Sequence, residues 1–147
     1  AYEIKECDWS SDVCSSDLPG LMVVLHEGDS AIRQIHTDGR KHTPDPQPTF
    51  MGYSVGTWDG DTLVVDTVGF NDNGWLDNRG SPRSDALHTV ERITRTDFGH
   101  LRIEVTLDDP KMYKKPFTVK FGANLLPDSD LQESVCAENE RDRQHFR

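Results

Sequence analysis

The residues best suited to chemistry lie in and just after one polar stretch, residues 71–92, which reads NDNGWLDNRGSPRSDALHTVER. His88 is the candidate general base, because an imidazole titrates near neutral pH and passes a proton efficiently when a carboxylate orients it. The candidate carboxylate partner is Asp77 or Glu91. These three residues form the candidate catalytic set of a hydrolase or lyase.

Three further residues of this stretch are candidate ligand-binding residues. Trp75 offers a flat ring on which a ligand can stack, and Asn71 and Arg92 can orient that ligand by hydrogen bonds. A loop longer than about a dozen residues in a compact domain is typically functional or disordered, and the indole favours order. We therefore expect any site to lie where residues 71–85 fold over the end of the central strands.

The same residues also have an ordinary structural interpretation. Asn and Asp side chains commonly cap turns, and Glu91 and Arg92 can pair with neighbouring strands. Beside these structural roles, two functional hypotheses stay open. One is a non-catalytic binding domain, and the other is an enzyme that uses His88.

The sequence lacks motifs for metal-dependent or nucleophilic chemistry. It contains no His-x-x-x-His, His-Glu-x-x-His or Cys-x-x-Cys spacing, and Asp59 and Asp61 at a hairpin tip provide too few oxygen ligands for a calcium loop. Ser54, in Gly-Tyr-Ser-Val-Gly, falls inside a predicted strand rather than on a nucleophile elbow. We therefore expect no metal ion and no cofactor.

The element that positions this stretch is a hairpin predicted for residues 51–70, MGYSVGTWDGDTLVVDTVGF. Asp59-Gly60 is typical of a tight hairpin turn and separates two strand-like runs, 53–58 and 62–68. Because the second run is rich in β-branched residues, it predicts a central strand.

The remaining predicted elements flank that hairpin. Alternating or apolar runs predict strands at residues 21–27, 31–37, 87–96, 100–107 and 117–122, although a helical turn from Ser84 competes with the start of the third. Three prolines in residues 41–49 predict an extended loop, and Asp130 with Glu133 predicts a helix over residues 130–146. The expected fold class is all-β and mainly antiparallel, a meander sandwich or a partly open barrel with a short C-terminal helix.

Residues 1–18, AYEIKECDWSSDVCSSDL, have neither periodicity nor an apolar core. Back-translation of residues 1–4 and 8–18 yields DNA that matches, in frame, the two constant parts of a common indexed short-read sequencing adapter. We therefore expect residues 1–18 to be a non-native, adapter-derived segment. Residues 19–147 are expected to form a single β-rich domain, truncated at its N-terminus.

Charge and hydropathy narrow the classes of partner. The chain has a formal net charge of −10, and residues 1–18 carry one lysine and five acidic residues, which leaves −6 for residues 19–147. This acidic balance disfavours nucleic-acid binding and a basic membrane-surface module, since both need clustered lysine and arginine. No apolar run reaches the ~20 residues of a membrane-spanning helix, so we expect no membrane span in the retained part.

Three strings carry a resemblance to known proteins: GYSVGTWDGDTLVVDTVGF, WLDNRGSPRSDALHTVERITR and DFGHLRIEVTLDDPKMYKKPFTV. They resemble a family of uncharacterised secreted bacterial proteins, and the likeness covers residues 19–147. The resemblance implies a periplasmic or secreted location, with an export signal upstream of the retained part. It also implies that Cys136, a free thiol in this chain, pairs with an upstream cysteine in the complete protein. Where the family often has Pro-His-Ser, this chain has Pro82-Arg83-Ser84, so no histidine role carries over there.

These observations lead to one expected function and one alternative. The expected protein is an extracytoplasmic β-domain that binds a small-molecule or carbohydrate-like ligand or a protein partner. The alternative is a hydrolase or lyase that uses His88 with Asp77 or Glu91. Convergence of His88, a carboxylate and Trp75 in one cleft would favour the enzyme.

Overall fold

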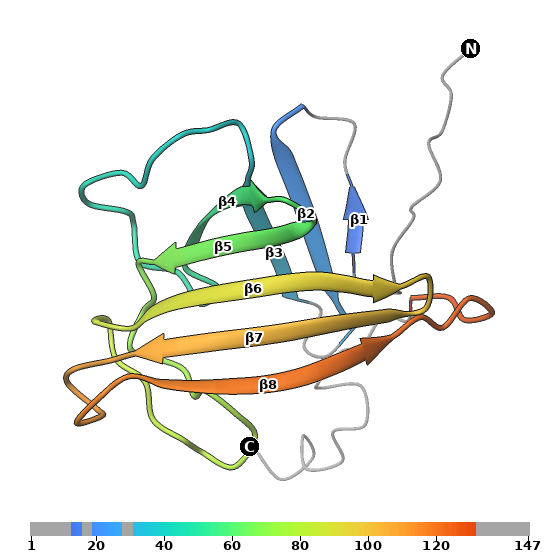
Figure 1. The fold of residues 1–147 in the computed structure, drawn as a ribbon. Helices are drawn as coiled ribbons and strands as arrows, with labels where there is room; N and C mark the ends of the chain where they lie inside the picture. Colours follow the sequence, from blue (N-terminus) through green and yellow to red (C-terminus); the bar gives the residue numbers. More distant parts are fainter. Residues whose placement is uncertain (1–12, 16–18, 28–30, 132–147) are drawn as a thin grey trace, which may run out of the picture.

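One eight-stranded sheet dominates the chain (Figure 1). The structure is a computed structural model that describes residues 13–15, 19–27 and 31–131. The strands neighbour one another in sequence order: β1 (Val13–Ser15), β2 (Leu21–His26), β3 (Ala31–His36), β4 (Tyr53–Asp59), β5 (Thr62–Val68), β6 (His88–Asp97), β7 (His100–Asp108) and β8 (Phe117–Asn124). The described residues contain no helix, and the sheet curls into a half-barrel, which confirms the expected all-β, partly open barrel.

Two sequence-based expectations fall outside the described residues. The helix expected over residues 130–146 lies there from residue 132 onward, and so does Cys136. The competing helical turn near Ser84 is instead a single turn, closed by a hydrogen bond from Leu87 N to Ser84 O at 3.2 Å, after which β6 begins.

The predicted central hairpin is present as β4 and β5. Its two-residue loop is Gly60–Asp61 rather than Asp59-Gly60, because Asp59 pairs with Thr62 across the hairpin. Gly60 has a φ of 60°, the left-handed conformation that a glycine adopts without strain. β5 is central as expected, since β4 and β6 both pair with it along most of its length.

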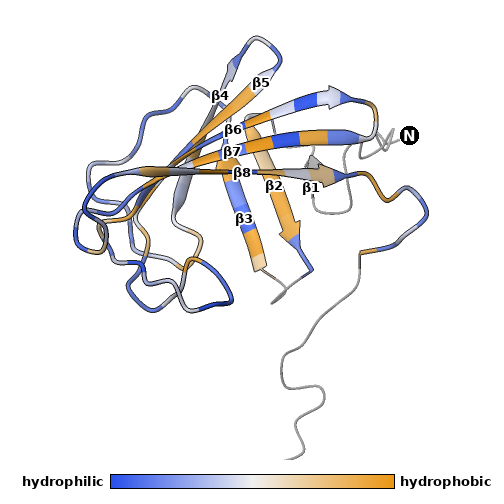
Figure 2. Cartoon of the chain, turned by 60° about the horizontal axis from the view of Figure 1, so that its bottom comes forward, coloured by the Kyte–Doolittle hydropathy of each residue, from blue (hydrophilic) through white to orange (hydrophobic). Residues whose placement is uncertain are grey.

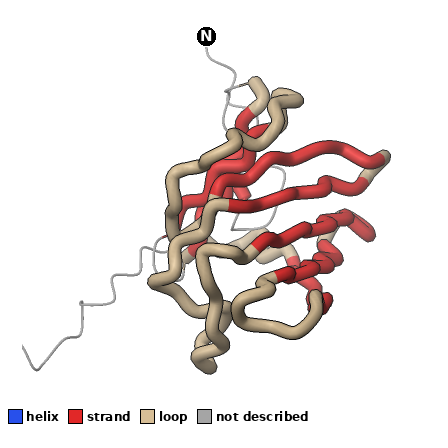
Figure 3. The backbone as a smooth tube through the Cα atoms, turned by 90° about the vertical axis from the view of Figure 1, so that its left-hand side faces the viewer, coloured by secondary structure: helices blue, strands red, loops and turns tan. Residues whose placement is uncertain are grey.

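The connection from β3 to β4 departs from a simple meander. These two strands run parallel and share only two residue pairs, Ile35 with Ser54 and His36 with Val55, whereas every other neighbouring pair is antiparallel. Parallel neighbours need a crossover of about a dozen residues or more, and the proline-containing residues 37–52 provide it. The long loops gather at the end of the sheet that faces the viewer in Figure 3.

The two faces of the sheet differ because alternate residues of a strand point to opposite sides. The inner face carries the core, which consists of two clusters. The first contains Ile35, Leu63 and Val65, and the second contains Phe70, Leu87 and Leu107. Orange and blue residues alternate accordingly along β6 and β7 in Figure 2. The opposite, outer face carries His36, Asp66 and His88.

One charged residue of the inner face joins four strands. Arg33 on β3 donates hydrogen bonds to Ser54 Oγ of β4 at 3.1 Å and to Thr67 Oγ1 of β5 at 2.8 Å. Its guanidinium also forms an ion pair with Glu91 of β6. Both charged side chains are at least 85% buried, so this network explains why β3 has a mixed polar and apolar pattern on its core side.

The segment expected to be non-native contributes one short strand. Within it, β1 pairs with the edge of β2 through three residue pairs, from Val13 with Val24 to Ser15 with Met22. β2 is therefore covered on its outer edge by a strand that the sequence did not predict.

Candidate functional site

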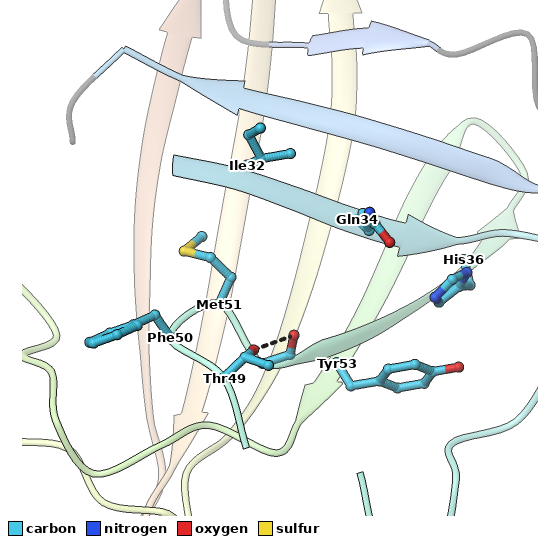
Figure 4. Close-up of a pocket in the computed structure, with 8 residues that line it drawn as sticks. Ile32, Gln34, His36, Thr49, Phe50, Met51 and Tyr53 are labelled. Carbon is cyan, nitrogen blue, oxygen red and sulfur yellow. Dashed lines mark hydrogen bonds between the residues drawn. The ribbon is translucent and has the colours of Figure 1, made fainter. Parts of the chain in front are cut away.

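The candidate site is a groove between β3 and two loops, which we call the β3 groove (Figure 4). It consists of two adjoining cavities of about 570 and 840 Å³ that share Ile32, Phe50 and Met51. The first cavity is also lined by Gln34, His36, Thr49, Gly52 and Tyr53, and the second by Ala31, Gly74, Trp75, Asp77, Asn78 and Arg83. Ile32, Phe50 and Trp75 are each at least 60% exposed, which is unusual for large apolar side chains.

The groove exists because the chain before β4 diverges from β3 on the N-terminal side of their two shared pairs. Residues 49–52 lead into β4 without pairing with the start of β3, and they turn through a hydrogen bond from Thr49 Oγ1 to Gly52 O at 3.1 Å, the dashed line in Figure 4. Gly52 has a φ of 67°, and a Cβ there would approach Thr67 Cγ2 to 2.6 Å. A glycine is therefore required where this wall of the groove passes over β5.

The loop that carries Trp75 is anchored beside the groove. Trp75 forms a bridge with Pro82, and Leu76 N donates a hydrogen bond to Ser81 O at 2.8 Å. Leu76 packs against the second core cluster, whereas Trp75 remains 66% exposed. Adjacent residues thus have different roles, since Leu76 holds the loop and Trp75 presents its ring to the groove.

Asp77 caps this loop. Its Oδ1 accepts hydrogen bonds from Arg79 N at 2.9 Å and Ser81 N at 3.1 Å, and its Oδ2 accepts one from Ser81 Oγ at 2.8 Å. The bonds from Ser81, followed by that from Arg79, lower the pKa of Asp77. Asp77 is therefore ionised at neutral pH, and both of its carboxylate oxygens already accept hydrogen bonds within its own turn.

Arg83 connects the two loops that line the groove. It donates a hydrogen bond from Nη1 to Phe50 O at 2.8 Å, and its guanidinium lies 5.3 Å from the centre of the Phe70 ring. It also crowds Gly74, where a Cβ would come within 2.3 Å of Arg83 Nη2. Burial lowers the pKa of Arg83, yet the guanidinium remains charged at neutral pH. Arg83 is thus a structural tie between the two loops.

A cluster of titratable residues lies on the outer face, next to the groove. Asp66 Oδ1 accepts hydrogen bonds from His42 Nε2 at 2.8 Å and from His88 Nε2 at 2.9 Å. The Tyr53 ring joins this cluster to the groove, since its centre lies 6.0 Å from that of His42 and 5.1 Å from that of His36. Two imidazoles that share one carboxylate oxygen are an arrangement suited to proton transfer. The same bonds tie His42 of the crossover to the sheet.

The structure separates most of the residues that the sequence grouped. His88 pairs with Asp66 and not with Asp77, and Glu91 lies on the inner face with Arg33. The structure therefore does not bring His88 together with Asp77 or Glu91, because strand alternation and loop capping place those carboxylates elsewhere.

The three predicted ligand-binding residues also lie apart from one another in the structure. Arg92 forms an ion pair with Asp59 at 2.7 Å near the hairpin tip. Asn71 Oδ1 accepts hydrogen bonds from Asn73 N at 3.2 Å and Arg83 Nη2 at 3.4 Å, within its own loop. Trp75 alone lines the groove.

Several residues of the site escaped the sequence analysis. The groove residues Ile32, Phe50 and Met51 come from two segments, and their proximity depends on the parallel crossover. Asp66 carried a usable signal, since it is the one acidic residue within the apolar strand β5. A lone carboxylate at an outward position of a central strand suggests a partner on a neighbouring strand or loop.

Two features are absent from the described residues. No group of three or more His, Cys, Asp or Glu side chains there is arranged to hold a metal ion. In the same part of the chain, no helix has the length and apolar character needed to cross a membrane.

Comparisons of the chain with protein-family profiles, with curated proteins and with solved structures give no match.

Proposed function

We propose that this protein is a ligand-binding domain and that its ligand occupies the β3 groove. The observation that carries the proposal is the exposure of Ile32, Phe50 and Trp75 around two adjoining cavities of about 570 and 840 Å³. Ligand sites typically have volumes of roughly 300 to 1,000 Å³ and mostly apolar linings with a few polar groups. Arg83 holds the loops together, which supports a groove that is largely formed before the ligand binds.

The lining favours an uncharged ligand with an apolar face. A carbohydrate-like ligand could stack on Trp75, but it needs many hydrogen-bonding side chains, and those of Asp77 and Arg83 already bond within their own loops. An apolar small molecule or a segment of a protein partner fits better. The resemblance to secreted bacterial proteins supports an encounter with this ligand in the periplasm or outside the cell.

Replacing Trp75 by alanine tests the proposal with Nile red, an uncharged apolar dye, as the probe. Loss of the ring should weaken dye binding by roughly 1 to 3 kcal/mol, whereas the free energy of unfolding should change by less than about 0.5 kcal/mol because the ring is exposed. Trp58→Ala is the matched control, since Trp58 is 57% exposed on β4 and does not line the groove. Equal dye affinities for Trp75→Ala, Trp58→Ala and the unaltered protein would refute the proposal.

A second variant separates the structural and binding roles of the loop. Leu76→Ala removes a side chain that packs on the core and should cost about 2 kcal/mol of stability. Under conditions where this variant is folded, it should retain more dye affinity than Trp75→Ala.

The His42–Asp66–His88 cluster favours acid–base catalysis as a second candidate function. The two imidazoles share one carboxylate oxygen and are at least 27% exposed, so a substrate can reach them. Turnover of a panel of chromogenic p-nitrophenyl esters and glycosides tests this function. A general base contributes about 10²- to 10⁴-fold, so His88→Gln should abolish any turnover, whereas Glu91→Gln should leave it intact where the variant folds. No turnover by the unaltered protein on the whole panel would remove support for this candidate.

A further inference from the structure

The edge of β3 that faces the groove is largely unpaired. On its other side β3 pairs with β2 along all six of its residues. On the groove side, only Ile35 and His36 are paired with β4. Among the described residues, therefore, no strand covers the groove side of residues 31–34.

The ladder shows which backbone groups face the groove. In an antiparallel ladder the residues of a strand alternately direct their N–H and C=O groups toward and away from the partner strand. Thr37 N donates a hydrogen bond to Gly20 O at 2.7 Å, and this pair continues the ladder of β2 and β3 by one residue. Because the bonding direction alternates along the strand, the odd-numbered residues of β3 bond to β2 and the even-numbered ones face the groove side. The N–H and C=O groups of Ile32 and Gln34 consequently point into the groove. The parallel bridge of Ile35 with Ser54 engages the C=O of Gln34, whereas the N–H of Gln34 and both backbone groups of Ile32 have no ladder partner on this side among the described residues.

Side-chain subsites adjoin this free edge. Ile32 and Gln34 line the groove from β3, and Phe50 and Met51 line it from the opposite wall. Trp75 extends the apolar surface into the second cavity. Unpaired backbone groups next to apolar subsites are the features by which a sheet edge recognises an added strand.

The charges of the lining cancel. Asp77 and Arg83 are the only carboxylate and the only guanidinium among the groove residues, and they carry opposite charges. Burial, aided by the Arg40 guanidinium, lowers the pKa of His36 against the opposing effect of Asp38, which favours the neutral imidazole. The complementary occupant is therefore an uncharged, apolar segment.

We propose that the β3 groove takes an uncharged, extended peptide segment, which adds to the sheet as a strand along the free edge of β3 at Ile32 and Gln34. The proposal rests on the proposed ligand-binding function and names its ligand class. A sugar would leave the backbone groups of the edge without a matched pattern of partners, whereas a peptide supplies alternating donors and acceptors at the spacing of a strand.

The test uses the peptide acetyl-Val-Thr-Val-Thr-Val-amide with the full chain and monitors hydrogen exchange of individual backbone amides. Binding should slow exchange at Ile32 and Gln34. Exchange at Arg33 and Ile35 should change less, because β2 already bonds their amides. Two N-methylated peptides add a matched control, one methylated on the valines and the other on the threonines. Since alternate residues of a strand face the same edge, one of the two should bind at least about tenfold more weakly than the other.

Substitutions at Gln34 provide a second, independent test. Gln34→Pro removes the donor that faces the groove and leaves the bonds to β2 in place, and proline is tolerated at a strand edge. It should weaken peptide binding by roughly two- to tenfold relative to Gln34→Ala, which keeps the donor. If Gln34→Pro does not fold, the N-methylated peptides alone decide the question.

The outcomes separate this inference from the function on which it rests. Nile red binding that depends on Trp75, with no peptide protection of Ile32 and Gln34, would overturn strand addition and leave a small-molecule groove. Equal binding of both N-methylated peptides would also overturn it. Failure of the dye and of the peptide together would overturn both proposals.

Discussion

His88 and Glu91 lie three residues apart on β6, yet their side chains project from opposite faces of the sheet. His88 bonds to Asp66 on the outer face, and Glu91 pairs with Arg33 on the inner face. Strand alternation separates them, so the two residues belong to different networks and should respond differently to substitution.

Removing only one partner of the Arg33–Glu91 pair should strongly destabilise the protein. Glu91→Ala leaves a largely buried guanidinium without its carboxylate, and the expected cost is about 3 kcal/mol of unfolding free energy. The double variant Arg33→Met, Glu91→Leu should recover most of that loss because it removes both charges. Urea denaturation of the three proteins measures this, and a double variant less stable than Glu91→Ala would contradict the expectation.

Asp66 should fasten the crossover to the sheet. Asp66→Ala removes the shared acceptor of His42 and His88, so hydrogen exchange should accelerate in residues 41–49. Stability should fall by about 1 kcal/mol, the usual net contribution of such bonds. Asp61→Ala, in the exposed hairpin loop, is the control and should change neither quantity. Unchanged exchange in both variants would show that the two histidines do not anchor the loop.

Asp109 should make stability depend on acidic pH. It is 1% exposed, and burial, the largest effect, raises its pKa. The hydrogen bonds donated by the Ser84 hydroxyl and amide, and by the Lys111 and Met112 amides, together outweigh burial and lower the pKa.

Because the folded pKa is depressed, this stabilisation is complete above the unfolded value of about 4 and is lost as pH falls through the folded value. Asp109→Asn should therefore be about 2 kcal/mol less stable at neutral pH, and its difference from the unaltered protein should shrink below pH ~4. Thermal unfolding across that range provides the measurement, and a difference independent of pH would be the contrary result.

Removal of residues 1–18 should leave the core intact. The part of this segment that the structure describes is the three-residue edge strand β1, which lies outside both core clusters, so the melting temperature should change by about 2 °C or less. The uncovered edge of β2 should, however, promote self-association, because an unpaired edge is a template for further pairing. Calorimetry and light scattering on Pro19–Arg147 test both statements. A large drop in melting temperature would show that the segment is part of the folded unit.

The sequence was most informative where structure is local. Alternation in residues 100–107 predicted the core-facing set of β7, and Leu107 is 8% exposed in the second core cluster. The hairpin of β4 and β5 was expected with its turn one residue early, because Asp59-Gly60 and Gly60-Asp61 are both good turn dipeptides and pairing along the strands decides between them.

Contacts that depend on the crossover could not be predicted. Nothing in the spacing of His42, Asp66 and His88 indicates that they meet, since His42 belongs to the β3–β4 crossover, whereas Asp66 and His88 lie on the paired strands β5 and β6. The mixed pattern of β3 was visible in the sequence, but Glu91, its buried partner, lies 58 positions away from Arg33. Long-range pairing of this kind is fixed by the whole sheet and not by any local segment.

The two-pair junction between β3 and β4 has a consequence for how the protein opens. With so little backbone pairing, this seam should be the line along which β2 and β3 separate from the rest of the sheet in local unfolding. A ligand in the groove touches β3 on one side and residues 49–53 on the other, and it would therefore bridge the seam. A ligand at about 100 times its Kd stabilises the bound form by about 2.7 kcal/mol. Ligand concentration would then control the lifetime of the β3–β4 junction and the resistance of residues 37–52 to proteases.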